Sequence, residues 1–234
     1  MGNHEFNALG WAKPDGNGGF LRPHIKQNKD QHVKFLDQIV ERSLAHRQAL
    51  AWFQSLPVWL EFPGLRIVHA CWYAPAQQAL LPHLDEAHRF ANAGLREAYL
   101  KGSKANEAME ILLKGPEVRL PDGRSFKDKQ GHTRHEVRIR WWDPEATTLR
   151  KAALGMDGSE SRLPDLPVTT EYHYAETTPV LFGHYWQQGA PVIATDYAAC
   201  LDYSVAKQGF LTAYRWSGES VLSPNNIVYV SAKQ

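Results

Sequence analysis

The sequence of 234 residues lacks the marks of several large protein classes. Its two cysteines, Cys71 and Cys200, are too few for a disulfide scaffold and lack the spacing of a cysteine-based metal site, which fits a reducing cytoplasm. No apolar run approaches the roughly 20 residues that a membrane-spanning helix needs, and no basic and then apolar leader opens the chain. We therefore expect a cytoplasmic protein with no membrane partner.

The chain also has no large excess of positive or negative charge. Lys and Arg total 26 against 25 Asp and Glu, so a formal net charge of +1 gives no bulk field for holding a polyanion. This disfavours a dedicated nucleic-acid coat protein, although a nucleic-acid end stays open as a substrate. The sequence also has no Gly-x-Ser-x-Gly elbow and no Walker-type phosphate loop, which disfavours a serine hydrolase and an NTPase.

Helical patterns dominate the first half of the chain. Residues 1–30 are rich in Gly and Pro and are interpreted as irregular loop. Apolar residues at three- and four-residue steps then predict one helix over 30–54, and two short strands are expected over 58–62 and 65–70. Helical composition continues over 84–114, with Gly94 and Gly102 as expected breaks.

Strand patterns dominate the second half. Together with the helices before them, these patterns predict a mixed α/β layered domain. A turn is expected over 118–124, a strand over 136–142, a short helix over 143–154, a linker over 155–167, and further strands over 180–182, 192–194, 210–216 and 227–230.

Three short motifs place histidine where a turn would present it: Gly2-Asn3-His4-Glu5, Val68-His69-Ala70 and Phe182-Gly183-His184. The last two follow apolar strands, and ligand sites assemble at the carboxyl ends of strands in open α/β sheets. Neutral imidazole suits Zn, Mn and Fe, and an amide oxygen such as that of Asn3 suits harder divalent ions. The alternative is structural histidine, since eleven are spread along the chain.

The order of these motifs resembles the calcineurin-like metallophosphoesterase family, in its phosphoprotein-phosphatase and bacterial diadenosine-polyphosphatase-like branch. Leu201-Asp202 followed by Leu211-Thr212-Ala213 fits two later strands of that branch. The resemblance covers residues 1–75 and 178–234. It implies an α/β four-layer sandwich of two mixed sheets flanked by helices, in a single domain over 1–234 with a divergent insert or cap at about 80–165.

The resemblance also implies a two-metal phosphatase chemistry. Asn3, His69 and His184 would ligate one of two divalent ions, Mn²⁺ first, with Fe, Zn or Ni as alternatives. The ions would activate a hydroxide, and His4 as general acid would protonate the leaving oxygen. Asn3 would also touch the phosphate. The substrate would be a phosphoprotein, a nucleotide or a dinucleoside polyphosphate.

The sequence departs from the family at its start. The family's Asp-x-His and Gly-Asp-x-x-Asp motifs, which hold the other metal, normally precede Gly-Asn-His-Glu, and here only Met1 does. The expected explanation is a truncated chain that lacks the family's N-terminal strands and helices. Two alternatives stay open: another polypeptide supplies those strands, or the protein is a non-catalytic binding or scaffolding relative.

A basic stretch in the insert is a candidate substrate-binding segment. On a strand from 136, Arg138, Arg140 and Trp142 would share one face and could clasp a phosphate. The alternative is a solvated face balanced by nearby carboxylates. The stretch comprises Lys127, Lys129, Arg134, Arg138 and Arg140.

Replacing Arg138 and Arg140 together with Ala is expected to raise the KM of the complete enzyme for anionic substrates, because two cations that hold the phosphate are lost. Steady-state kinetics on several phosphate esters would measure this, and unchanged KM values would contradict it.

Overall fold

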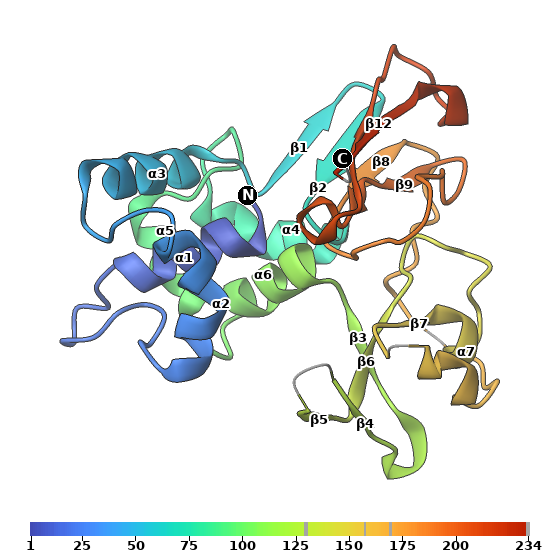
Figure 1. Cartoon of the computed structure of the whole chain (residues 1–234), viewed down its shortest axis with the longest axis horizontal. Coiled ribbons are helices and arrows are strands. Elements are labelled where there is room, and N and C mark those ends of the chain that lie inside the picture. The colour runs from blue at the N-terminus through green and yellow to red at the C-terminus, as the bar shows by residue number, and fades with distance from the viewer. Residues whose placement is uncertain (129–130, 157, 169, 233–234) are drawn as a thin grey trace. The chain divides into compact units, whose positions relative to one another are not determined.

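The computed structural model describes residues 1–128, 131–156, 158–168 and 170–232. They form two compact units, described separately: a helical unit of residues 1–60 and 74–114, and a sheet unit of residues 61–73 and 115–234. Across the described residues, seven α-helices and four small sheets confirm the mixed α/β class (Figure 1). The segment 80–165, expected to be an insert, divides between the units at residue 114.

The helical unit packs its helices in neighbouring pairs. Helices α1 and α3 are in contact, as are α4 and α6, and α5 and α6. Leu80, Leu95 and Met109 are among its fully buried side chains. The helices are α1 (Asn3–Ala12), α2 (Lys26–Leu36), α3 (Leu44–Ser55), α4 (Ala74–Leu80), α5 (Asn92–Tyr99) and α6 (Lys104–Lys114).

Helix α1 corrects the expectation of an irregular loop over residues 1–30. Gly2 is the N-cap, and its backbone N–H donates to the Glu5 carboxylate at 2.9 Å. Gly10 lies inside the helix, where an added Cβ would be 2.4 Å from Cε1 of Tyr99. The ring of Tyr99 stacks on Phe6 at 4.1 Å. The glycine that suggested a loop therefore provides room for a packed ring.

The single helix expected over 30–54 is wrong, because the chain leaves helical geometry between α2 and α3. Arg42 has a φ of 64°, outside the helical region. The Ser43 hydroxyl then accepts from the backbone N–H of His46 at 3.1 Å and starts a new helix. Apolar residues recur at helical spacing across both helices, so their pattern alone does not indicate the N-cap at Ser43.

The two glycines expected to break the 84–114 segment behave differently. Gly102 has a φ of 82° and separates α5 from α6, as predicted. Gly94 lies within α5, where an added Cβ would be 2.2 Å from the His83 carbonyl oxygen. It permits close packing rather than a break.

The main sheet contains strands β1 (Trp59–Phe62), β2 (Leu65–Val68), β8 (Val180–Phe182) and β9 (Ala198–Cys200), in the order β1-β2-β8-β9. Strand β8 runs parallel to both neighbours, with Ile67 opposite Leu181 and Leu181 opposite Ala199. Every residue of β8 and β9 is buried, which is typical of parallel strands covered on both faces. The strands expected over 58–62, 65–70 and 180–182 are confirmed.

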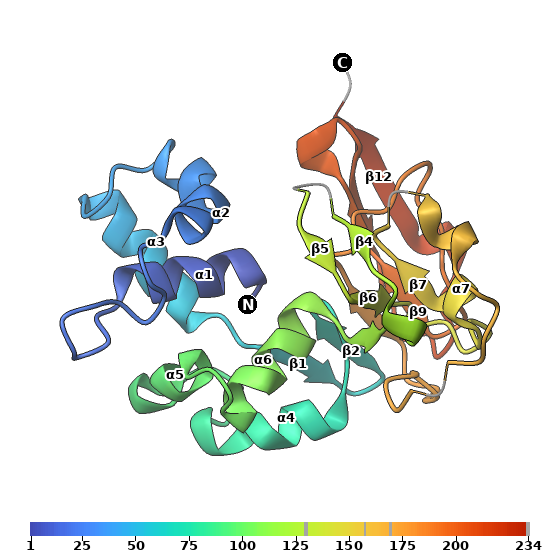
Figure 2. The ribbon, with the colours of Figure 1, turned by 90° about the horizontal axis from the view of Figure 1, so that it is seen from below.

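The insert sheet consists of β3 (Glu117–Arg119), β6 (Glu136–Ile139) and β7 (Ala153–Leu154), and a separate hairpin pairs β4 (Phe126–Lys127) with β5 (Thr133–Arg134). Strand β6 is shorter than the expected 136–142. The helix expected over 143–154 is reduced to α7 (Leu149–Ala152). Residues 143–148 before it are not helical, and β7 after it pairs with β6 (Figure 2).

A third sheet pairs β10 (Asp202–Tyr203), β11 (Phe210–Tyr214) and β12 (Ile227–Ser231) in antiparallel order. Strands β11 and β12 lie within or near the expected 210–216 and 227–230. The strand expected over 192–194 is wrong: those residues are irregular, and the strand in this region is β9. In the part of the chain that the structure describes, no helix combines the length and the apolar character needed to cross a bilayer.

His32 gives the helical unit a predicted sensitivity to acid. Its ring is buried near Trp11 and Phe35, and desolvation, followed by the charge of His46, lowers its pKa from 6.5 to about 4. The unfolded chain takes up this proton below pH 6.5, whereas the folded chain resists it until about pH 4. Stability should therefore fall by about 1–2 kcal/mol as the pH drops through this window.

Urea unfolding at several pH values would measure this effect, and His32→Phe should flatten the profile because it keeps the ring and removes the proton. His135→Phe, at an exposed position, serves as the control. An unchanged profile in His32→Phe would assign the acid sensitivity to other groups.

Candidate functional site

Three polar side chains follow the carboxyl ends of adjacent strands in the main sheet. His69 comes directly after β2, His184 comes two residues after β8, and Asp202 comes two residues after β9. Because these strands are parallel, their carboxyl ends meet at one edge of the sheet. The fold thus brings His69 and His184 to a common edge from distant parts of the sequence.

The two imidazoles face each other at close range. Their ring centroids are 5.2 Å apart with an edge-on interplanar angle of 65°. The backbone supports this approach, because the N–H of Gly183 donates to the carbonyl of His69 at 2.9 Å and extends the β2–β8 pairing beyond the strands. Both histidines are half-buried. The pair predicted from sequence is therefore assembled within the sheet unit.

The backbone after β8 adopts conformations that side-chain-bearing residues rarely take. His184 has a φ of 71° and Trp186 a φ of 44°. Such positions cost of order 1–3 kcal/mol each and persist where surrounding contacts fix them. One fixing contact is the hydrogen bond from the N–H of Gln187 to the carbonyl of Asp202, at 2.8 Å. The loop that carries His184 is thus held by the first residue of β10.

Trp141 joins the two histidine-bearing segments from the insert side. Its indole Nε1–H lies 2.9 Å from the carbonyl oxygen of Ala70 and 3.0 Å from the hydroxyl of Tyr185, and donates to both. Its ring is fully buried and packs against Phe182 at 4.9 Å. Burial raises the pKa of Tyr185 well above its usual value, so this hydroxyl stays protonated. Trp141 therefore fixes the residues that follow His69 and His184.

Asp202 is a further polar residue at this edge of the sheet, beside Gly183. An ideal Cβ on Gly183 would lie 3.6 Å from the Cβ of Asp202, so the two loops are in contact. One carboxylate oxygen of Asp202 accepts from the backbone N–H of Ser204 at 3.1 Å. Its position after a buried strand is the same signal that selected His69 and His184.

The two cysteines lie next to the site but act as apolar side chains. Cys71 and Cys200 are buried and form no disulfide. Burial raises the pKa of the Cys71 thiol well above its usual value and that of Cys200 to about 12. With so high a pKa, both thiols stay protonated at neutral pH and are poor nucleophiles.

Asn3 and His4 belong to the helical unit, as the first two residues of α1. His4 is exposed and Asn3 is half-buried. The neighbouring Glu5 anchors the start of the helix, because its carboxylate accepts from the backbone N–H of Gly2. The ligand role of Asn3 and the acid role of His4 stay predictions from the resemblance.

The basic stretch does not form the shared face that was expected. Strand β6 ends at Ile139, because the chain turns through a bond from the N–H of Asp143 to the carbonyl of Arg140 at 3.2 Å. Trp142 is consequently buried against Phe182, whereas Arg140 is exposed. Lys129 lies outside the described residues.

Carboxylates compensate two charges of this stretch. Arg138 forms an ion pair with Glu117 at 3.5 Å, and Arg134 forms one with Asp128 at 2.9 Å. This geometry favours the alternative of a balanced, solvated face for these two arginines. Arg140 remains the more accessible member of the proposed substrate-binding pair.

The donor set fits a divalent ion in part. Two imidazoles converge, and neutral imidazole is a common ligand of Mn, Fe and Zn. Within the described residues, however, no group of three or more His, Cys, Asp or Glu side chains is placed to hold a metal ion. The sheet unit therefore supplies a ligand pair and not a complete cage.

Comparison with known proteins gave no similarity: no family model, curated protein or solved structure matched the chain.

Replacing Trp141 with Phe should destabilise the sheet unit by about 2–3 kcal/mol, because the Ala70 carbonyl and the Tyr185 hydroxyl lose their buried donor and a void remains. Urea unfolding would measure the change. Trp52→Phe is the matched control, since the Trp52 side chain is 62% exposed and should lose little. Equal effects of the two substitutions would contradict the joining role of Trp141.

Proposed function

We propose that this protein is a metal-dependent phosphoesterase of the calcineurin-like kind, with a four-layer sandwich as its complete fold. His69 and His184 are the proposed metal ligands in the sheet unit. Their juxtaposition at the carboxyl ends of adjacent parallel strands, 5.2 Å between ring centroids, is the observation that supports the proposal. The roles of Asn3 as a further ligand and His4 as general acid rest on the resemblance of their motif.

The reaction would be hydrolysis of a phosphate ester. A divalent ion, when bound, supplies Lewis acidity and lowers the pKa of its water. His69 and His184 would hold the ion through ring nitrogens, and the strained loop at His184 keeps one of these rings in place. Protonated His4 would donate a proton from a ring nitrogen to the leaving oxygen, which is a poor leaving group without it.

A non-catalytic binding relative is the second candidate. The observation that favours it is the missing third His, Cys, Asp or Glu donor in the described part of the chain. Two neutral imidazoles without a carboxylate bind hard cations weakly, because no ligand charge compensates that of the ion. Such a protein would bind metal at His69 and His184 without turnover.

Binding of Mn²⁺ to the full chain would test the ligand pair directly. We expect His69→Ala and His184→Ala each to weaken Mn²⁺ binding about tenfold or more, because each removes one imidazole. Calorimetry or the electron paramagnetic resonance signal of free Mn²⁺ would measure it. His135→Ala, an exposed histidine of the same unit, should leave the affinity unchanged. Equal affinities in all variants would remove the basis of the proposal.

Hydrolysis of p-nitrophenyl phosphate with Mn²⁺ tests the catalytic candidate. Metal-dependent turnover that His4→Ala abolishes would support the phosphoesterase. Metal binding at the histidine pair without turnover is expected both of the binding relative and of a truncated phosphoesterase, and the upstream coding sequence would then decide between these two.

A further inference from the structure

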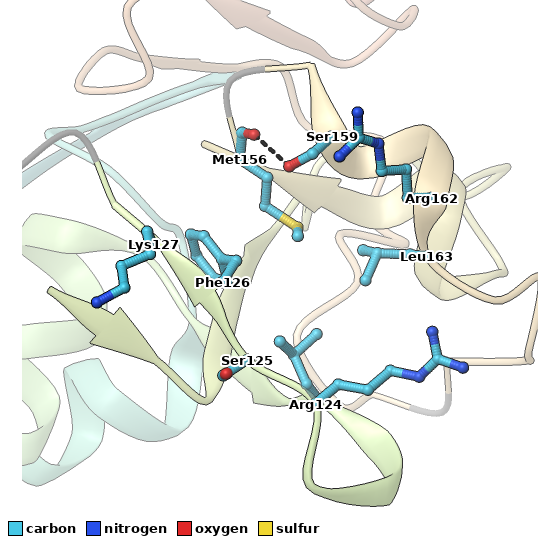
Figure 3. A pocket seen from close by; sticks show the side chains of 9 residues that line it. Arg124, Ser125, Phe126, Lys127, Met156, Ser159, Arg162 and Leu163 are labelled. Atoms are coloured by element: carbon cyan, nitrogen blue, oxygen red, sulfur yellow. Dashed lines mark hydrogen bonds between the residues drawn. The ribbon is translucent and has the colours of Figure 1, made fainter. Parts of the chain in front are cut away.

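The sheet unit holds a cavity of about 400 Å³ on its insert part, with an apolar floor that includes Leu120, Met156 and Leu163 (Figure 3). Arg124 and Arg162 lie on opposite borders of this cavity, so the structure does not bring both guanidinium groups to one ligand. A more closely defined arrangement of reactive groups lies in the helical unit, in the loop that joins α1 to α2.

This loop is a short hairpin. The backbone N–H of Leu21 donates to the carbonyl of Lys13 at 2.9 Å, and the N–H of Asp15 donates to the carbonyl of Gly19 at 3.1 Å. Residues 16–18 lie between the two arms and form the tip of the hairpin. The path of the backbone at the tip is therefore set by the paired arms.

The Asp15 carboxylate organises the tip from inside. Its Oδ1 accepts the backbone N–H of Asn17 at 2.7 Å and that of Gly19 at 2.9 Å. These bonds hold the pKa of Asp15 below its ordinary value, so the carboxylate is ionised and accepts both donors at neutral pH. The Arg96 guanidinium, from α5 of the same unit, donates to the Asp15 carbonyl. The N–H groups on either side of Gly18 are thus engaged by one carboxylate.

The backbone N–H of Gly18 differs from its two neighbours. It forms no hydrogen bond with the described part of the chain, and neither does the side-chain amide of Asn17. Both residues are exposed. Gly18 has a φ of 88°, and a Cβ added to it would have no heavy atom within 4 Å. The Gly18 nitrogen and the Asn17 amide carbon are therefore both accessible.

We propose that Asn17 is a modification site, at which the side-chain amide is lost spontaneously through a cyclic imide. Hydroxide removes the proton of the Gly18 backbone nitrogen, which attacks Cγ of Asn17 and forms a five-membered ring. The Cγ–Nδ2 bond breaks, and ammonia leaves with a proton taken from water. Water then opens the ring at Cγ, giving aspartate, or at the main-chain carbonyl, giving isoaspartate. This site is separate from the histidine pair and does not rest on the proposed function.

The neighbouring residue distinguishes Asn17 from the other asparagines. It is the only one of the eight that precedes glycine, which has no side chain to shield its backbone nitrogen. Asn28, in α2, shows the contrasting geometry, because the N–H that follows it, that of Lys29, donates to the Ile25 carbonyl at 3.0 Å. A nitrogen held in a helical hydrogen bond cannot attack the preceding amide without breaking that bond.

Peptide mass spectrometry of the full chain after incubation at about pH 8 tests the proposal, because loss of the amide adds about 1 Da to the peptide that carries it. We expect this gain at Asn17 and not at Asn225, an exposed asparagine that is followed by another side chain. Part of the product should be a substrate for an isoaspartate-specific methyltransferase. No gain at Asn17, or an equal gain at Asn225, would overturn the proposal.

Substitutions separate the chemistry from the loop geometry. Gly18→Ala should slow the conversion at least about tenfold, because its methyl group hinders the attacking nitrogen. Lys29→Gly is the matched control: it places a glycine after Asn28, but α2 engages the N–H, so Asn28 should convert at least about tenfold more slowly than Asn17.

The two variants have distinct contrary outcomes. Unchanged conversion in Gly18→Ala would overturn attack by the Gly18 nitrogen. Equal rates at Asn17 and at Asn28 of the Lys29→Gly protein would overturn the contribution of the hairpin tip.

Discussion

The parallel pairing of β2 with β8 is the constraint on which the rest of the sheet unit depends. It joins Ile67 to Leu181 and so sets His69 and His184 side by side. A parallel pair is hydrogen-bonded slightly less favourably than an antiparallel one and needs burial on both faces. The fully buried β8 and β9 meet that need. The register of the β2–β8 pairing therefore sets the positions of the residues that follow these strands.

The insert is attached to this sheet through Trp141. A single indole N–H serves both the Ala70 carbonyl and the Tyr185 hydroxyl, in a place where water cannot replace it. An unsatisfied buried acceptor costs more than an average hydrogen bond gains, so this contact opposes separation of the insert from the sheet. The loop strain at His184 and Trp186 is therefore balanced by contacts from two elements, the insert and strand β10.

The sequence predicted three strands of the main sheet, β1, β2 and β8, but placed the fourth strand at 192–194 instead of at β9. It predicted the boundaries of the helices poorly. Short apolar runs next to Pro63-Gly64 and Gly183 left little choice for β1, β2 and β8. Helix α1 was missed because Gly2 and Gly10 suggest a loop unless the packed ring of Tyr99 is known. Long-range contacts of this kind are not encoded in local spacing.

The candidate site, like the fold, was predictable from the sequence only in part. His69 and His184 follow strands, so the rule for carboxyl ends sufficed to group them. Trp141 could not be identified, because its role arises from contacts with Ala70 and Tyr185. The predicted shared face of Arg138, Arg140 and Trp142 is wrong, because a turn that begins at Arg140 ends the strand and Trp142 is buried in the core.

The long connection between β2 and β8 has a consequence for how the protein folds. The helices contact neighbours that are mostly close in sequence, whereas β2 pairs with a strand that lies more than a hundred residues later in the chain. Loop closure over such a distance is slow, and high contact order lowers folding rates. Until β8 arrives, the edge of β2 is open to pairing with other chains, so dilute conditions and chaperones should matter most for this part of the protein during synthesis.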